Sequence, residues 1–358
     1  MSHNKKISFY LPNLDGGGAE RVMLNLANNL SESGKSVDLI LSKKKGEYIS
    51  IIHEKINVID LNSEKVLFSL FKLISVLNKR RSQVLISALN HANIIASLAS
   101  LISRSKISHV MTVHNSLLHK KNIYIDFVIL FIMRLFSIFS FRVVAVSESV
   151  RQELVTKLFF NKKRTIVINN PINSNFIKSQ YLNLNIHHKL PKKYIVGCGR
   201  LTHQKDFQNL ILSYNEVRKI NDIELVILGE GEERDNLLSL IKNLRLENKV
   251  HLLGFVHNPY VFFRNAEMFV LSSRWEGLPT VLIEAMCCGT QVISTDCPGG
   301  SAFILEDGKW GQLTKVGDYQ GLSIAINNVL SGKFRVNPEL RSKAFDESVI
   351  LKEYLEIL

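Results

Sequence analysis

The sequence of 358 residues is poor in the residue types that mark several classes of protein. It has four cysteines, Cys198, Cys287, Cys288 and Cys297, and they do not form the repeated C-x-x-C or Cys/His pattern of a metal site. We therefore expect neither structural zinc nor a disulfide framework, as is typical of a reduced cytosol. Gly (19) and Pro (7) are not enriched, which excludes collagen-like and low-complexity chains.

Long apolar runs are also missing. The one transmembrane candidate, residues 123–141, is interrupted by Asp126 and Arg134. Its longest unbroken apolar stretch, Phe127 to Met133, is far shorter than the roughly 20 residues that span a bilayer. We expect a buried helix here, with insertion into one leaflet as the alternative. No apolar leader with a cleavage site is present at the start, so we expect no signal peptide and a cytoplasmic protein.

Acidic residues are scarce in only one half of the chain. Residues 1–170 carry 24 Lys and Arg against 11 Asp and Glu, whereas residues 171–358 carry 21 of each. The formal net charge of +13 therefore belongs to the N-terminal half. Such an excess indicates nucleic acid, an anionic membrane or a phosphorylated ligand as the partner.

The spacing of the basic residues favours the membrane. In residues 65–81, Lys65, Lys72 and Lys79 recur every seven residues, with apolar residues on another helical face. This pattern is typical of a helix lying on an anionic membrane, or of an ordinary surface helix, and both remain open. Aromatic residues do not alternate with the cations as in a single-strand binding groove, so no nucleic-acid partner is expected. Membrane contact through 65–81 or through 120–142 is equally compatible with the sequence.

Short β-branched runs alternate with helical patterns along the whole chain. Because the runs are almost continuously apolar, they predict parallel sheets covered on both faces. The fold class expected is α/β, with two Rossmann-like parallel-sheet domains facing a cleft. We predict a first domain at 1–172, a linker at 173–190, a second domain at 191–340, and a C-terminal helix at 341–358 that crosses back to the first domain.

Two loops that follow predicted strands have the residues of a phosphate site. Gly17 and Gly18 precede a helical run, and a helix N-terminus offers free N–H groups to a phosphate, although a plain tight turn is the alternative. After the strand at 194–197, Arg200 and Lys205 can converge on a diphosphate, or form a solvated basic loop. In open α/β sheets, ligands bind at such carboxyl ends.

Two carboxylates and a histidine complete the candidate residues. Pro279 and Gly289 predict a helix from Pro279 to Cys288 that is apolar except at Glu284. A buried carboxylate needs a compensating partner, such as ligand hydroxyls or an arginine. Glu276 precedes the same helix, and His114 directly follows the strand at 109–113.

These residues match a known family. Glu276 and Glu284 form an E-x7-E motif inside EGLPTVLIEAMCCGTQVISTD, and GCGRLTHQKDFQNLI, LVILGEGEERDNL and GGGAERV occur in order. Over almost its whole length the chain resembles retaining glycosyltransferases of family 4. The resemblance implies the two-domain GT-B fold, with a nucleotide-sugar site between the domains.

The resemblance also implies a role for each candidate residue. Arg200 and Lys205 would neutralise the donor diphosphate, Glu276 would bind sugar hydroxyls, Glu284 the ribose, and Gly17 and Gly18 the phosphates. His114 would lie near the donor sugar, and backbone groups of Gly277 and Leu278 would contact sugar or phosphate. The chain departs from the family at Phe303, where an acidic residue is common, so a polar role of that position is in doubt.

The function implied is a retaining, metal-independent hexosyltransferase. It would move a hexose or N-acetylhexosamine from a nucleotide sugar, with UDP expected, to a lipid-linked oligosaccharide in O-antigen, capsule or exopolysaccharide assembly. We expect a peripheral location on the inner face of the cell membrane. No cofactor is expected, because the sequence has no Asp-x-Asp tripeptide to hold a metal. A sugar phosphorylase or disaccharide synthase with a soluble acceptor, and a nucleic-acid-binding protein, are the alternatives.

Overall fold

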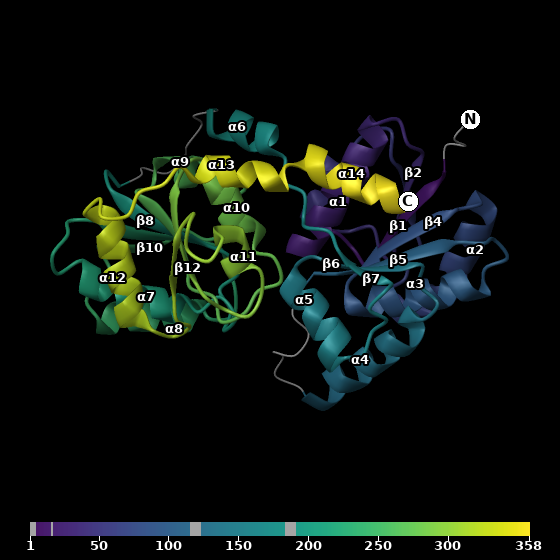
Figure 1. Ribbon diagram of the computed structural model, residues 1–358, viewed down its shortest axis with the longest axis horizontal. Helices are drawn as coiled ribbons and strands as arrows, with labels where there is room; N and C mark the ends of the chain where they lie inside the picture. Colours follow the sequence, from purple (N-terminus) through teal and green to yellow (C-terminus); the bar gives the residue numbers. More distant parts are fainter. Residues whose placement is uncertain (1–4, 16, 115–122, 183–190) are drawn as a thin grey trace. The chain divides into compact units, whose positions relative to one another are not determined.

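The computed structural model describes residues 5–15, 17–114, 123–182 and 191–358. The chain divides into two compact units, which Figure 1 shows in colours that follow the sequence. Unit 1 consists of Met1–Pro171 and Glu347–Leu358, and unit 2 of Ile172–Asp346. No helix in the described ranges combines the length and the apolar character needed to cross a bilayer.

Unit 1 is built on a seven-stranded parallel sheet with the order β3-β2-β1-β4-β5-β6-β7. Its strands are β1 (Ile7–Leu11), β2 (Val37–Leu41), β3 (Asn57–Asp60), β4 (Val84–Ala88), β5 (Ser108–Val113), β6 (Arg142–Ala145) and β7 (Thr165–Val167). Its helices are α1 (Gly18–Glu32), α2 (Leu70–Arg80), α3 (Asn90–Ile102), α4 (Ile123–Ser137), α5 (Glu148–Gln152) and α14 (Glu347–Ile357). Short helical turns are η1 (Glu47–Ile51), η2 (Val66–Ser69) and η3 (Glu153–Lys157).

Both faces of this sheet are covered. Successive strand residues point to opposite faces, so Phe9 packs in the core under α1 and α14, while Tyr10 packs in the core under α2 and α3. The connections through α2, α3 and α4 all run in one direction along the sheet, and the connection through α1 runs in the other. Because such crossovers are right-handed, α2, α3 and α4 share one face of the sheet and α1 covers the other.

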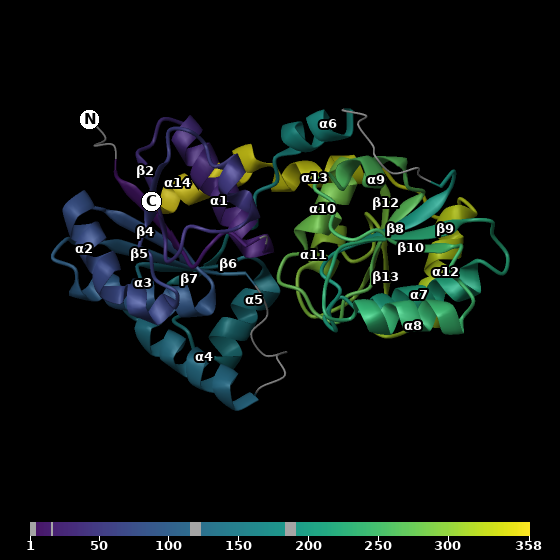
Figure 2. The same ribbon diagram turned by 180° about the vertical axis from the view of Figure 1, so that it is seen from behind.

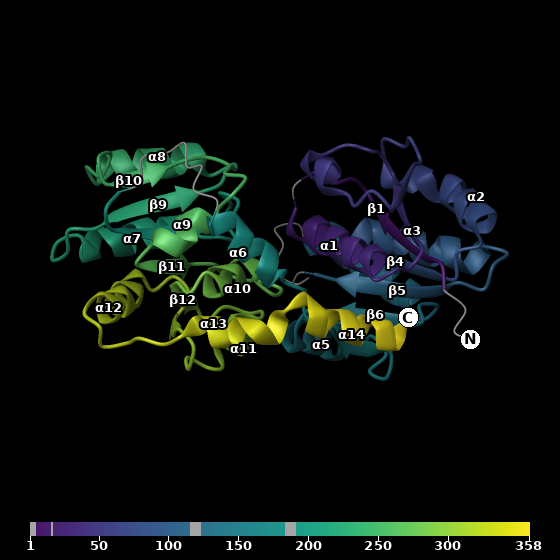
Figure 3. The same cartoon turned by 90° about the horizontal axis from the view of Figure 1, so that it is seen from above.

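The C-terminal helix α14 returns to unit 1, as predicted, and its yellow ribbon lies there in Figures 1 and 3. Ile350 and Tyr354 are fully buried in the core that α1 covers. The return begins at Glu347 and not at Arg341. Residues before it stay in unit 2 because Phe345 is buried and Asp346 bridges Ile172.

The segment 173–190 expected as a linker differs in structure. Residues Ser174–Leu182 form helix α6, which belongs to unit 2 and packs against α9 and α10. Only Ile177 on this helix is buried, so no apolar periodicity marks it in the sequence. Residues 183–190 lie outside the described part of the chain.

Unit 2 has a six-stranded parallel sheet with the order β10-β9-β8-β11-β12-β13. Its strands are β8 (Tyr194–Cys198), β9 (Glu224–Leu228), β10 (Val250–Leu252), β11 (Met268–Leu271), β12 (Gln291–Thr295) and β13 (Gln312–Thr314). Its other helices are α7 (Phe207–Val217), α8 (Arg234–Asn243), α9 (Tyr260–Asn265), α10 (Thr280–Cys287), α11 (Ser301–Leu305), α12 (Tyr319–Leu330), α13 (Pro338–Ser342) and η4 (Lys343–Phe345). The central strands β8, β9, β11 and β12 are almost wholly buried, as the continuous apolar runs predict.

Candidate active site

In unit 2 the predicted residues lie on the loops that leave the carboxyl ends of neighbouring strands. The loop after β8 carries Arg200 and Lys205, and the loop after β11 carries Glu276. These two strands are adjacent in the sheet, so their loops meet. The order of the strands therefore brings the loop with Lys205 next to the loop with Glu276, although the two residues lie about 70 positions apart in the sequence.

Lys205 and Glu276 form an ion pair. The Lys205 Nζ lies 2.6 Å from Glu276 Oε1, and the Ser273 hydroxyl donates to the same oxygen at 2.6 Å. The side chains of Lys205 and Glu276 are 17% and 6% exposed. Because a buried carboxylate without a partner is costly, the ammonium and the hydroxyl together compensate the burial of Glu276. The family resemblance implied that the two residues bind different parts of a ligand, and it did not imply that they touch.

The loop after β8 needs glycine at its first position. Gly199 has φ +155°, and a Cβ atom there would come within 3.1 Å of Lys205 Cε. The Lys205 side chain thus folds back over Gly199 toward Glu276. Gly229, at the end of β9, approaches so closely that a Cβ atom would lie 2.0 Å from the Gly199 carbonyl oxygen. Two glycines of the predicted motifs therefore set the shape of this loop.

Further hydrogen bonds and an ion pair connect the loops after β8 and β11. The Gln204 carbonyl accepts a hydrogen bond from the Arg274 N–H, and the Gln204 side chain donates to the Trp275 carbonyl. The Arg274 guanidinium lies 3.0 Å from the Asp206 carboxylate, whose side chain is 4% exposed. Ser272 donates to the Lys205 carbonyl at 2.9 Å. These contacts fix the backbone on both sides of the Lys205–Glu276 pair.

The loop after β12 supports Glu276 from a further side. The Glu276 N–H donates to the Pro298 carbonyl, and a Cβ atom on Gly299 would lie 2.4 Å from the Glu276 carbonyl oxygen. Burial beside this carboxylate raises the pKa of the Cys297 thiol to about 11. Cys297 is therefore an uncharged thiol at neutral pH and a poor nucleophile.

Arg200 differs from Lys205 in its surroundings. It is exposed, and within the described ranges its guanidinium makes no hydrogen bond or ion pair. The two cations share a loop, as predicted, but they do not engage a common partner.

The helix that carries Glu284 is close to its predicted extent. It runs from Thr280 to Cys287, and Gly289 follows with φ +76°, as expected of a terminating glycine. Glu284 is buried at 8% exposure. Gly277 and Leu278 are also buried, and the Leu278 side chain packs against Gly300.

Phe303 has a packing role. Its ring meets Phe345 edge-on with the centroids 6.0 Å apart, and the Arg341 guanidinium lies over both rings. Arg341 also donates to the Phe303 and Ile304 carbonyls. The apolar residue at this position therefore packs against the segment that leads out of unit 2, and its ring faces the Arg341 guanidinium.

The remaining predicted residues, His114, Gly17 and Gly18, lie in unit 1. His114 follows β5 and is 9% exposed, and its Nε2 lies 3.0 Å from the Thr112 hydroxyl. Burial lowers the pKa of His114 to about 4, an effect that the Asn170 side chain opposes. His114 is thus a neutral imidazole at physiological pH. Its Nδ1 has no hydrogen-bond partner in the described part of the chain.

Gly17 and Gly18 open helix α1. Gly17 is the N-cap and Gly18 the first helical residue, so the helix N-terminus lies where the sequence predicts it. The Glu20 carboxylate folds back against Gly17, and a Cβ atom there would lie 2.1 Å from it. An acidic side chain thus occupies the end of the helix that favours negative charge. A bound phosphate would have to share this position with Glu20, which the sequence did not indicate.

Comparison with known proteins identifies the family. Residues 184–346 match the model of glycosyl transferases group 1, and residues 16–176 match that of glycosyltransferase family 4. The N-acetylgalactosamine-N,N'-diacetylbacillosaminyl-diphospho-undecaprenol 4-alpha-N-acetylgalactosaminyltransferase of Campylobacter jejuni is 31% identical, and the match covers 99% of both chains. The chain belongs to glycosyltransferase family 4.

Other relatives agree with this assignment. The amylovoran biosynthesis glycosyltransferase AmsD of Erwinia amylovora is 28% identical to this glycosyltransferase over 96% of both chains. The structure of HepE from Anabaena, in complex with UDP and glucose, matches with a TM-score of 0.84 at 22% identity and covers 98% of both chains. This confirms the predicted GT-B class, with two Rossmann-like parallel sheets and a C-terminal helix that returns to the first.

Proposed function

We propose that this glycosyltransferase moves a hexose or N-acetylhexosamine from a UDP-sugar to a lipid-linked oligosaccharide, with retention of the anomeric configuration. The observation that carries the proposal is the buried Lys205–Glu276 pair, on the loops that follow the carboxyl ends of β8 and β11. The pair brings an ammonium and a carboxylate into contact, and Arg200 lies on the same loop as Lys205. A diphosphate-linked sugar needs both kinds of group.

The cations would act on the leaving group. When the C1–O bond to the β-phosphate breaks, the nucleoside diphosphate gains negative charge, and preorganised positive groups stabilise that charge. Lys205 is held in place by Glu276 before the donor binds, so its ammonium needs little reorganisation. Arg200 would supply a planar fork that binds two phosphate oxygens. These two residues would perform the task without a metal ion.

Retention would follow from attack on the same face of the sugar that the phosphate leaves. The acceptor hydroxyl forms the new bond to C1, the bond from C1 to the phosphate oxygen breaks, and the hydroxyl proton passes to the departing phosphate. Glu276 would accept hydrogen bonds from donor hydroxyls. His114 is neutral, and its Nε2 lies 3.0 Å from the Thr112 hydroxyl, so it would act near the donor sugar as an uncharged group.

The lipid-linked acceptor is proposed on two grounds. The Campylobacter relative, which covers the whole chain, is named for a diphospho-undecaprenol acceptor, and the Erwinia relative for amylovoran biosynthesis. The charge of the chain is concentrated in its N-terminal half, which suits work at the inner face of an anionic membrane.

A screen of UDP-sugars with the purified full-length protein tests the proposal. We expect slow hydrolysis of one hexose or N-acetylhexosamine donor, unchanged by EDTA, and, when an acceptor is added, a glycosidic product whose NMR spectrum shows the donor's anomeric configuration. Inversion would contradict the same-face mechanism, and loss of turnover in EDTA would contradict the metal-free role of Arg200 and Lys205. A folded protein that turns over no donor would contradict the transferase activity proposed here.

A further inference from the structure

The two oxygens of the Glu276 carboxylate have different surroundings. Lys205 Nζ and the Ser273 hydroxyl both lie 2.6 Å from Oε1. The other oxygen, Oε2, accepts no hydrogen bond from the described residues, and it is not one of the unpartnered atoms that the fold seals from solvent. Because each carboxylate oxygen accepts about two hydrogen bonds, Oε1 is fully occupied. Oε2 is therefore the oxygen that a ligand can reach.

Ser273 is held in place by the sheet of unit 2. It lies two residues after β11 and is fully buried, and its carbonyl accepts a hydrogen bond from the Thr295 hydroxyl at the end of β12. Strand β11 lies between β8 and β12 in this sheet, which Figure 2 shows from behind. A serine hydroxyl has one proton, and Ser273 donates it to Glu276. The sheet thus fixes the direction from which Oε1 is held.

The neighbouring Ser272 makes a different contact. It is 1% exposed, and its hydroxyl donates to the Lys205 carbonyl at 2.9 Å. This hydrogen bond holds the backbone of the loop after β8, and it involves no side chain that is expected to meet a ligand. Two adjacent buried serines therefore have separate tasks, one at the backbone and one at the Glu276 carboxylate.

The two donors to Oε1 differ in what else they can bind. The Lys205 ammonium has three N–H groups, and in the described part of the chain only the one on Oε1 makes a hydrogen bond. Two N–H groups therefore remain for a diphosphate. The Ser273 hydroxyl has no second proton to donate to another acceptor. When a diphosphate draws the ammonium toward itself, the hydroxyl is the contact that stays on Oε1.

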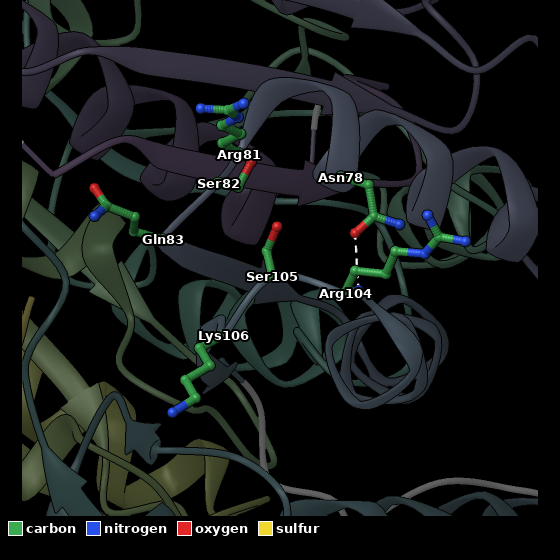
Figure 4. A pocket seen from close by; sticks show the side chains of 7 residues that line it. All are labelled: Asn78, Arg81, Ser82, Gln83, Arg104, Ser105 and Lys106. Atoms are coloured by element: carbon green, nitrogen blue, oxygen red, sulfur yellow. Dashed lines mark hydrogen bonds between the residues drawn. The ribbon is translucent and has the colours of Figure 1, made fainter.

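A pocket in unit 1 has none of these features. It lies at the amino ends of β4 and β5, has a volume of about 670 Å³ and is lined by no acidic residue. Figure 4 shows that the cationic ends of Arg81, Arg104 and Lys106 point in different directions there. It lacks both converging cations and the carboxylate that the proposed reaction assigns to sugar hydroxyls. The transferred sugar is therefore assigned to Glu276 and not to this pocket.

We propose that Ser273 is a positioning residue: it holds Oε1 of Glu276 while Lys205 binds the donor diphosphate, and so presents Oε2 to hydroxyls of the donor sugar. This role rests on the proposed function, in which Glu276 accepts those hydrogen bonds. It affects only ligands that carry the sugar, because the ribose and the phosphates are assigned to Glu284, Arg200 and Lys205.

Calorimetric titration of the full-length protein with nucleotides tests this role. The ligands are UDP, UDP-glucose, UDP-galactose and the two corresponding UDP-N-acetylhexosamines. For Ser273→Ala we expect the affinity for the UDP-sugar that the wild type binds to fall about tenfold, and the affinity for UDP to change by less than about twofold. Ser272→Ala is the matched control, since it removes a buried hydroxyl one residue away. Its loss should be equal for UDP and for the UDP-sugar.

A double-mutant cycle tests whether Ser273 acts through Glu276. In a Glu276→Gln background, Ser273→Ala should cause a much smaller further loss of affinity for the UDP-sugar, because the contact that Ser273 supports is already altered. Ser273→Cys replaces the hydroxyl with a weaker donor and should give an intermediate loss. Circular dichroism checks the fold of each variant, and Ser273→Cys takes the place of Ser273→Ala if the latter does not fold.

Each outcome decides the proposal. Equal losses for UDP and the UDP-sugar in Ser273→Ala, as in the Ser272→Ala control, would overturn it and leave Ser273 with a structural role only. Wild-type affinity of Ser273→Ala for the UDP-sugar, or an equal loss in both backgrounds of the cycle, would also overturn it. A wild-type protein that binds UDP but no UDP-sugar would overturn the proposed function itself. That failure is distinguishable because it is seen before any substitution is made.

Discussion

At the residue scale, the Lys205–Glu276 pair links the stability of the site to its chemistry. Each charge compensates the other in a part of unit 2 where both side chains are mostly buried. Removing one partner leaves a buried charge without compensation, which is destabilising. When a diphosphate binds, Lys205 would gain a second anion, and Glu276 would be free to accept hydrogen bonds from sugar hydroxyls.

Replacing Lys205 with alanine should lower kcat for donor turnover by about 100-fold or more, with a smaller change in KM, because the ammonium acts on charge that develops in the transition state. The measurement is steady-state kinetics with the donor found in the screen. Lys219→Ala is the matched control, since Lys219 forms an exposed ion pair with Glu216 in the same unit. A kcat for Lys205→Ala equal to that of the control would remove Lys205 from the mechanism.

His109 predicts a dependence of stability on pH. It is fully buried in unit 1, hydrogen-bonded to Ser87, Ser97 and Ser140, and burial lowers its pKa to about 3. The unfolded chain binds a proton near pH 6.5, so stability present above that pH is lost as the pH falls toward 3. The free energy of unfolding should fall by about 1.4 kcal/mol per pH unit from this residue, and His114 adds to the slope above pH 4.

Urea unfolding at a series of pH values between 7 and 4 measures this slope. His109→Gln keeps hydrogen-bonding capacity but cannot titrate, so the slope should become shallower in the variant. A wild-type slope that the substitution leaves unchanged would contradict the account of His109.

For single residues, the sequence predicted the positions of candidate site residues whose type is required by the binding of a charged ligand. Arg200, Lys205 and Glu276 stand on loops that follow predicted strands, and Glu284 stands on the predicted helix, where they were expected. Contacts across loops were not predictable, because they depend on which strands are neighbours in space. Ser273 is the clearest example. Its hydroxyl donates to Glu276, but the spacing of three residues predicts this hydrogen bond only if the loop is known to fold back on itself.

At the element scale, α14 shows how a short helix stabilises a unit far from it in sequence. Its return to unit 1 was predicted from the sequence. The structure gives the physical reason, which is the burial of Ile350 and Tyr354 in the core beneath α1. Helix α6 could not be predicted in the same way, because only Ile177 on it is buried. The prediction for α4 was half right, since one of its faces is buried and the other is exposed.

Replacing Ile350 with alanine should reduce the free energy of unfolding of unit 1 by about 2–5 kcal/mol, because it removes a fully buried side chain and leaves a cavity. Val349→Ala on the same helix is the control, since Val349 is 42% exposed and its loss should cost much less. Urea unfolding followed by circular dichroism compares the two. Equal effects would show that α14 does not pack on the unit 1 core in solution.

At the scale of the whole molecule, charge and chemistry are divided between the two halves. The positive excess belongs to the N-terminal half, and the C-terminal half is neutral and carries Lys205, Glu276 and Glu284. The difference in charge between the two halves could be counted in the sequence. The position of the charged residues on the surface of the molecule could not be predicted from it. Only the fold shows that α2, α3 and α4 share one face of a sheet, and that apolar residues of α4 are exposed.

Transfer of labelled sugar from the UDP donor into the solvent-extracted lipid fraction tests the central claim most directly. The full-length protein is incubated with vesicles that contain a diphosphate-linked lipid oligosaccharide, and Lys205→Ala is run beside it. The account predicts label in the lipid fraction with the wild type, retained anomeric configuration at the new linkage, and a loss of about 100-fold or more in the variant. Wild-type protein that hydrolyses the donor but labels only soluble sugars, or a Lys205→Ala variant that transfers at the wild-type rate, would contradict it.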